Sequence, residues 1–308
     1  APVEPYIYLR GNRHNRGPRV PRQFLEHLAP NRKPFQKGSG RLELAQAIAD
    51  PANPLTARVL VNRIWGHHFG RGLVTTPSDF GLRASPPSHP QLLDWLAARF
   101  IAEGWSLKKL HRKILLSATY QQASHNREAY RKTDPDNTYL WKINRQRLTL
   151  EALRDGILQA SGQLDLKIGG RSVSITKHPT TPRRTLYGLI DRQNLPAIFR
   201  TFDFASPDAH CPRRYENTVP QQALFLMNSP FTIDQSRKLI EREGFKSAKD
   251  NRARLEFLYQ TVFQRPPSAL ELADARDYVG AVPVKERTGA WGEFAQVLLL
   301  SNEFRFVD

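Results

Sequence analysis

Sulfur chemistry is almost absent from this 308-residue chain, because Cys211 is its one cysteine. A single thiol excludes an intrachain disulfide, and the CxxCH motif of covalent haem attachment does not occur. Free cysteines usually behave as small hydrophobes, so we expect Cys211 to be buried among apolar side chains.

Long apolar runs are also missing, and no stretch is long enough to span a bilayer. The chain opens APVEPYIYLRGN, in which no basic start is followed by an apolar segment, so no signal peptide is visible. The expectation is either a cytosolic protein or a fragment of a longer exported chain.

Local catalytic signatures are missing as well: we find no HExxH, P-loop, GxSxG or dinucleotide-binding fingerprint. This absence favours a non-enzymatic function. The competing hypothesis is a hydrolase for anionic carbohydrate, with Asp155, Asp203 and His210 near an arginine-lined cleft. A carboxylate pair for glycoside hydrolysis needs a separation of roughly 5 to 9.5 Å, which no linear sequence reveals.

Positive charge, in contrast, is abundant: 46 lysines and arginines face 29 acidic residues, for a formal net charge of +17. Such an excess attracts polyanions, whether nucleic acid, anionic polysaccharide or an acidic protein surface. Composition alone does not choose among these partners.

One predicted helix, capped by Ser106, separates charge from apolar residues with helical spacing. Its expected inward side chains are Leu107, Leu110, Ile114 and Ala118. The basic side chains expected on the opposite face are Lys108, Lys109, Arg112 and Lys113. The pattern fits both a solvated charged face and a docking surface for anions.

Arginines also occur in close pairs, among them Arg183 with Arg184 and Arg213 with Arg214. A guanidinium group binds carboxylate, sulfate or phosphate through two parallel hydrogen bonds. The four arginines are therefore candidate binding residues, although internal salt bridges to Asp155, Asp191 and Asp203 would satisfy them equally well.

Hydrophobic periodicity predicts a mainly α-helical fold with a small β hairpin or sheet element near residues 165–192. Residues 1–40 read as a lead-in strand near residue 7 and a linker arm rich in proline, glycine and arginine. Residues 41–308 form one mainly helical domain, with a possible sub-domain boundary near 165–215.

Two adjacent histidines, His67 and His68, stand near the end of a predicted helix at residues 55–69. Successive residues point roughly 100° apart around a helix, so the two rings cannot easily chelate one ion together. We expect packing and hydrogen bonding here, with no metal and no cofactor in this chain.

Four separated motifs, taken in order, resemble one family. They read NPLTARVLVNRIWGHHFGRGLVTTPSDFG, SHPQLLDWLAARFIAEGWSLKKLHRKILLSATYQQAS, RLTLEALRDGIL and CPRRYENTVPQQALFLMNSPF. The family is the planctomycete cytochrome-associated domain of unknown function numbered 1553. The positions that match its motifs are Asn62, Arg63, Trp65, Gly70, Asp79, Gly81, Pro90, Arg147, Arg154, Asp155, Arg184, Cys211, Arg214, Gln222 and Asn228. Gln146 departs from the pattern, where arginine is common.

The resemblance implies mainly the kind of polypeptide in which this domain occurs. Members resemble the C-terminal part of exported multidomain proteins with a cytochrome c-like domain upstream, which would place any covalent haem before residue 1. The family brings no established activity and hence no catalytic residue.

These observations together predict an extracytoplasmic, non-enzymatic module that binds an anionic polysaccharide or an adjacent domain of the same polypeptide. The hydrolase is the first alternative and a nucleic-acid-binding protein the second. Nucleic-acid binding shares the charge requirement but conflicts with the inferred compartment.

Overall fold

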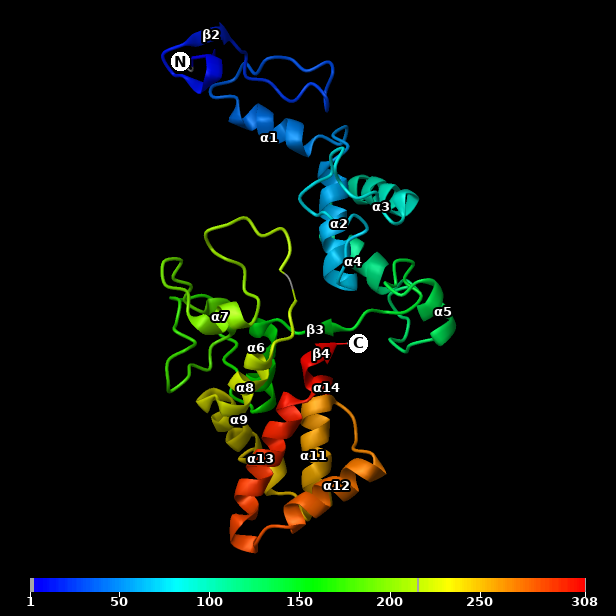
Figure 1. The fold of residues 1–308 in the computed structure, drawn as a ribbon, viewed down its shortest axis with the longest axis vertical. Coiled ribbons are helices and arrows are strands. Elements are labelled where there is room, and N and C mark those ends of the chain that lie inside the picture. The colour runs from blue at the N-terminus through cyan, green and yellow to red at the C-terminus, as the bar shows by residue number, and fades with distance from the viewer. Residues whose placement is uncertain (1–2, 215, 308) are drawn as a thin grey trace. The chain divides into compact units, whose positions relative to one another are not determined.

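The computed structural model describes residues 3–214 and 216–307, and within them it contains fourteen α-helices and two small two-stranded sheets. The predicted mainly helical class is therefore confirmed (Figure 1). The chain divides into two compact units, residues 1–144 and 145–308.

The first unit begins with an antiparallel hairpin and continues through five helices. Its elements are β1 (Tyr6–Tyr8), the 3-10 helix η1 (Leu9–Gly11), β2 (Arg16–Arg19), α1 (Arg41–Ala49), α2 (Thr56–Phe69), α3 (Pro90–Ala102), α4 (Leu107–Leu115) and α5 (Glu128–Thr133). The predicted strand near residue 7 is present as β1, which pairs with β2 in the register Tyr6 to Arg19.

The core of the first unit forms where α2 packs against α3 and α4. Val61, Ile64 and Trp65 lie on the buried face of α2, as the helical spacing predicts. Gly70 ends the helix in a left-handed conformation with φ of 76°. The amide of Asn62, which is almost fully buried, accepts from the Val74 N–H and donates to the Val74 carbonyl, holding the following loop on the helix.

His68 has the packing and hydrogen-bonding contacts expected of it. Its Nε2 lies 2.7 Å from Nδ1 of His111, and its ring makes an edge contact with Tyr120. Burial, followed by the charges of His111 and His67, lowers the pKa of His68. His67 lies on the exposed side of the same helix. The described residues contain no group of three or more histidine, cysteine, aspartate or glutamate side chains arranged to hold a metal ion.

The second unit is a helical bundle closed by a short sheet. Its elements are β3 (Gln146–Arg147), α6 (Leu150–Ala160), the 3-10 helix η2 (Thr185–Tyr187), α7 (Ala197–Thr201), α8 (Pro220–Asn228), α9 (Pro230–Ile240), α10 (Glu243–Lys246), α11 (Asn251–Phe263), α12 (Ala269–Gly280), the 3-10 helix η3 (Val284–Glu286), α13 (Arg287–Leu300), α14 (Asn302–Arg305) and β4 (Phe306–Val307). Helix α13 is central and packs against α8, α9, α11 and α12 (Figure 1).

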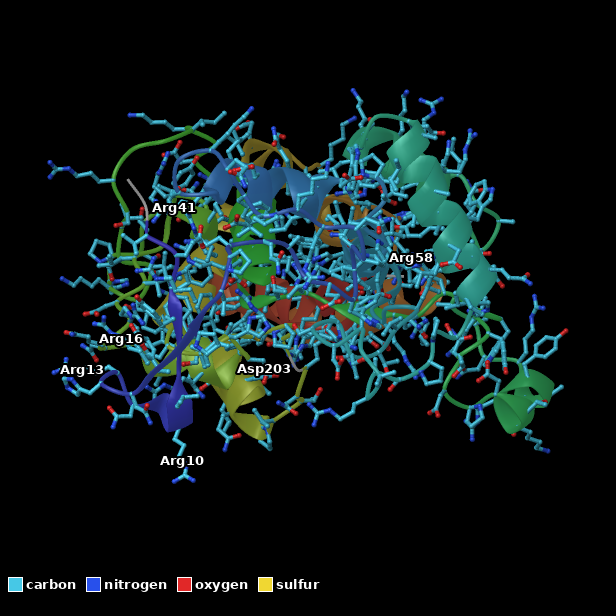
Figure 2. All side chains as sticks on the ribbon, turned by 90° about the horizontal axis from the view of Figure 1, so that it is seen from above. Arg10, Arg13, Arg16, Arg41, Arg58 and Asp203 are labelled. Atoms are coloured by element: carbon cyan, nitrogen blue, oxygen red, sulfur yellow. The ribbon has the colours of Figure 1, made fainter. Side chains whose placement is uncertain are left out.

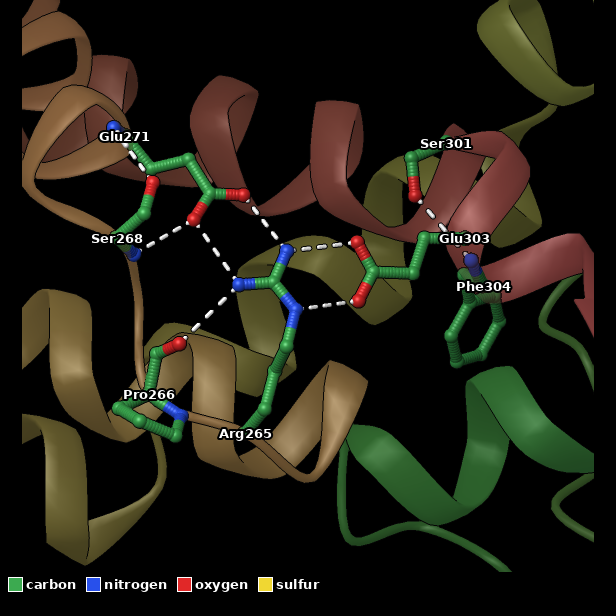
Figure 3. A network of polar contacts seen from close by, with 7 residues as sticks. All are labelled: Arg265, Pro266, Ser268, Glu271, Ser301, Glu303 and Phe304. Carbon is green, nitrogen blue, oxygen red and sulfur yellow. Dashed lines mark hydrogen bonds and ion pairs between the residues drawn. The ribbon is translucent and has the colours of Figure 1, made fainter. Parts of the chain in front are cut away.

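Both ends of this unit meet in one sheet, because β3 and β4 pair antiparallel with Arg147 opposite Phe306. An arginine fork supports the same region: Arg265, in the loop between α11 and α12, makes ion pairs with Glu271 and Glu303 (Figure 3). Together these contacts fix α14 and the end of the chain to the bundle.

The prediction of a β hairpin or sheet near residues 165–192 is wrong, because no strand forms there. This segment contains only isolated bridges between Asp165 and Arg183 and between Val173 and Gly188, followed by η2. A continuous β ladder does not form, because Gly169 and Gly170 adopt positive φ. In addition, the Arg183 guanidinium group donates hydrogen bonds to the Lys167 and Gly169 carbonyls, which a neighbouring strand would otherwise use.

The division between units lies at residues 144 and 145, upstream of the 165–215 region considered from sequence. The physical reason is the presence of two separate cores. One apolar cluster draws on residues 57–143 and the other on residues 150–299, so α6 belongs wholly to the second. No helix among the described residues combines the length and apolarity needed to cross a membrane.

Candidate functional site

Helix α4 carries the cationic face that the sequence predicted. Ser106 caps it by accepting from the Lys109 backbone N–H, as expected. Leu110 and Ile114 are 2% exposed and anchor one side of the helix, while Lys108, Lys109 and Arg112 are exposed on the other. Two predicted inward residues are corrected: Leu107 is exposed, and the helix ends at Leu115, before Ala118.

The fourth predicted cation on this helix is already neutralised. The Lys113 ammonium lies 2.8 Å from the Glu103 carboxylate, which Arg99 also contacts at 3.0 Å. The hydrogen bond from Lys113 lowers the pKa of Glu103. Among the described residues, no carboxylate forms an ion pair with Lys108, Lys109 or Arg112. These three side chains, which we call the α4 basic face, are therefore open to an anionic partner.

A second cationic cluster, which sequence reasoning missed, lies on the β1–β2 hairpin (Figure 2). Its members, the hairpin arginines, are Arg10, Arg13, Arg16 and Arg19. All four are exposed, and none forms an ion pair with a carboxylate of the described residues. Arg16 and Arg19 both stack on the Tyr6 ring, at 5.3 and 4.9 Å. Four arginines within ten residues were the available signal.

Charge is distributed unevenly between the units. Residues 1–144 carry 22 basic against 10 acidic side chains, a net charge of +12, whereas residues 145–308 carry 24 against 19, a net charge of +5. Most of the excess charge of the chain therefore belongs to the unit that holds the α4 basic face and the hairpin arginines.

Three of the four candidate arginines in the second unit are used internally. Arg183 pairs with Asp165 at 3.4 Å and stacks on Tyr187, and Arg184 lies 3.5 Å from Asp155. Arg214 binds Glu151 at 2.9 Å and stacks on Phe204. Arg213 alone of this group is exposed without a carboxylate partner in the described residues. Internal ion pairs are thus the main role of these arginines, but of the partners considered from sequence only Asp155 is used; Asp203 pairs with Arg147 instead, and no ion pair joins Asp191 to these four arginines in the described residues.

Asp203 belongs to an internal hydrogen-bond network and does not face an open cleft. Its carboxylate accepts from Arg147 at 2.7 Å and from both the backbone and side-chain N–H groups of Asn217. Arg147 also donates to the Gln222 side chain, whose amide donates to the Thr201 and Asn217 carbonyls. Burial raises the pKa of Asp203, but the donors from Asn217 and Arg147 outweigh it and hold the pKa below its ordinary value.

Asp155 is engaged in a similar way. Its Oδ1 accepts from the Thr185 N–H and hydroxyl, both at 2.7 Å. The neighbouring Arg154 is buried and donates to the Arg183 and Thr181 carbonyls and to the Thr185 hydroxyl. The pair therefore ties α6 to η2 and to the irregular segment before it.

The three weak catalytic candidates do not converge on one cavity. A cavity of about 330 Å³ in the second unit is lined by residues of α6, α7, α8 and α9 and of the segment from Ile175 to Thr180. Asp155, Asp203 and His210 are absent from its lining. His210 lies exposed in the irregular loop that follows Asp203. Because its donors hold the pKa of Asp203 below the ordinary value, this carboxylate carries no proton near neutral pH and is a poor general acid.

The expectation for Cys211 is wrong. Its thiol is exposed, and it donates to the Arg213 carbonyl at 3.2 Å. The loop from Asp203 to the start of α8 lacks regular structure in its described part, so it offers no apolar layer in which a thiol could be buried; Tyr215 lies outside the described residues.

Comparison with known proteins gives one finding. A family model described as PSD1, protein of unknown function (DUF1553), matches residues 40–279. No curated protein and no solved structure matches the chain. Because the match covers more than half of its residues, this chain belongs to the PSD1 (DUF1553) family, the planctomycete cytochrome-associated domain of unknown function.

Proposed function

We propose that this chain is a non-catalytic module of an extracytoplasmic, cytochrome-linked polypeptide, and that it binds anionic polysaccharide through the α4 basic face. The observation that carries the proposal is the state of Lys108, Lys109 and Arg112. All three are exposed and lack an acidic partner within the described residues, on a helix whose other side is anchored in a core.

Charge and rigidity support this assignment together. On helix α4, Arg112 lies three residues after Lys109 and four after Lys108, so it neighbours both of them on the helix surface. Lys108 and Lys109 flank it about 100° apart, and the three cations together cover one broad side of the helix. The net charge of +12 in the same unit adds a long-range attraction for polyanions. The extracytoplasmic setting rests on the family resemblance, in which exported polypeptides carry this domain.

The test is binding of the purified chain to heparin, with neutral dextran as the uncharged comparison. The variant changes Lys108, Lys109 and Arg112 to glutamine, and the matched control changes the exposed lysines Lys246, Lys249 and Lys285 of the second unit. Each cation near a polyanionic surface contributes on the order of 1 kcal/mol, so we expect the α4 variant to bind roughly 100-fold more weakly. The control should retain its affinity within about threefold.

Equal weakening in both variants would overturn the assignment, because it would show that net charge matters and position does not. Double-stranded DNA provides the remaining comparison. Tighter binding to DNA than to heparin, lost in the same α4 variant, would replace the polysaccharide with nucleic acid.

A further inference from the structure

The cavity in the second unit has the lining of a small-molecule site. Its interior is apolar, with Leu153 and Ile157 from α6 and Leu226 from α8, each no more than 3% exposed. Exposed residues, Thr176, His178 and Ala197, also line it and mark its opening. Its volume of about 330 Å³ is at the lower end of the range for ligand pockets, roughly 300–1,000 Å³.

Besides His178 at the opening, whose Nδ1 lies 3.6 Å from an Asp234 carboxylate oxygen, one ionisable side chain joins this apolar lining: Arg154, which is 5% exposed. Its hydrogen bonds all go to neutral acceptors: the carbonyls of Arg183 and Thr181 and the hydroxyl of Thr185. Within the described residues no carboxylate oxygen lies within ion-pairing distance of its guanidinium group. The adjacent Asp155 is directed to Thr185 and Arg184 instead.

The Nε of Arg154 has no hydrogen-bond partner, although it is fully buried. Its guanidinium carbon lies 5.1 Å from the centre of the Phe231 ring, which also lines the cavity. A buried charge without an ion-paired carboxylate is costly: burial lowers the pKa of Arg154, and the nearby negative charge of Asp155 offsets this only in part. An anion in the cavity would supply both the missing charge and an acceptor.

We infer that this cavity binds a small amphipathic monocarboxylate, with its hydrocarbon body among Leu153, Ile157 and Leu226 and its carboxylate directed to Arg154. Apolar walls with a single buried cation select for one negative group on an otherwise apolar molecule. The site is independent of the α4 basic face, since α4 belongs to the other unit.

The experiment is isothermal titration of the purified chain with decanoate, compared with decanol and decyltrimethylammonium. A hydrogen bond to a charged group favours the carboxylate over the isosteric neutral ligand, so decanoate should bind at least about tenfold more tightly than decanol, at one per chain. Decyltrimethylammonium should bind most weakly of the three.

Two variants locate the site. Ala197→Trp places a large side chain at the opening from an exposed position and should abolish decanoate binding. Arg154→Met removes the cation and should reduce the affinity for decanoate to that for decanol. Arg200→Gln is the matched control. It removes one exposed positive charge outside the cavity, from α7, the helix that also carries Ala197, and this variant should bind decanoate as the unmodified chain does.

Decanoate binding no tighter than decanol binding would overturn the inference, as would full decanoate binding by Ala197→Trp. Arg154→Met removes donors from two carbonyls, so circular dichroism checks that it folds. If it does not, the ligand comparison and Ala197→Trp decide the question alone. Loss of heparin binding in the α4 variant with decanoate binding unchanged would separate this site from the proposed polysaccharide surface.

Discussion

The ion pair between Arg147 and Asp203 allows the bracing role of the polar residues to be tested directly. Its side chains are only 9% and 14% exposed, and the two residues are 56 positions apart in the chain. Asp203→Asn removes the charge and keeps the shape. It adds no backbone strain, because Asp203 has a φ of 59° and asparagine adopts that left-handed region readily.

The expected cost follows from the partners left behind. Removing one member of a buried ion pair costs about 3–5 kcal/mol, but the asparagine carbonyl keeps one acceptor for Arg147 or Asn217. We therefore expect a loss of about 2–3 kcal/mol in the free energy of unfolding at pH 7. In urea this corresponds to a midpoint lower by roughly 1–2 M.

Asp208→Asn is the matched control. It is the same substitution in the same loop, at a carboxylate that pairs with Arg192 while both side chains are more than 60% exposed. Exposed pairs contribute about 0–1 kcal/mol, so this variant should unfold close to the unmodified chain. A loss below 0.5 kcal/mol in Asp203→Asn, equal to that in Asp208→Asn, would refute the bracing role and reopen a chemical role for Asp203.

Three further outcomes follow from the same structure. Hydrogen bonds from Arg265 lower the pKa of Glu271 from its ordinary value of 4.5 to about 2 (Figure 3). Because this pKa is depressed, the contribution of the ionised Glu271 to folding stability is complete above about pH 4.5 and is lost as the pH falls toward 2. Glu271→Gln should remove roughly 1–2 kcal/mol of this acid-sensitive stability, a value reduced for solvent screening, as measured by urea unfolding between pH 2 and 6. A stability profile in Glu271→Gln as steep as in the unmodified chain would contradict this. Asn62→Ala leaves the buried Val74 N–H and carbonyl unpaired and should cost about 2–5 kcal/mol in the same assay, whereas Asn126→Ala, at an exposed position, should cost under about 0.5 kcal/mol. Cys211 should react with Ellman's reagent in the folded chain within minutes, and reaction only after urea is added would show that the thiol is buried after all.

Local signals in the sequence were enough for most of the helices. Proline and glycine mark the limits of α2 and α8, and the apolar spacing identifies the inner faces of α2, α3 and α6. Capping predicted the start of α4 at Ser106. Such features act within a few residues of one another, so one sequence is sufficient to read them.

Contacts between distant residues were not predictable in the same way. The β character of residues 165–192 depends on whether another strand pairs with it, and here the Arg183 side chain takes its carbonyls instead. The internal pairing of Arg214 depends on Glu151, which is 63 residues away. The cavity gathers residues from five segments between Leu150 and Phe231, so no local pattern announces it.

The candidate binding residues likewise divide into those that local periodicity predicts and those that depend on distant partners. Lys108, Lys109 and Arg112 follow from helical periodicity and are exposed where expected. The exposure of Arg183 and Arg184 could not be judged without knowing where Asp165 and Asp155 lie. The hairpin arginines were overlooked because the segment was interpreted as a linker arm.

The salt dependence of heparin binding tests the central claim most directly. For nucleic acids the logarithm of the affinity falls by about 0.7–0.9 per contacted charge for each unit in the logarithm of the salt concentration. If the three cations of the α4 basic face all contact the polysaccharide, the slope should be shallower by about 2–3 in the variant with Lys108, Lys109 and Arg112 changed to glutamine. Identical slopes in the variant and the unmodified chain would contradict the account, because they would show that polyanion binding occurs without this face.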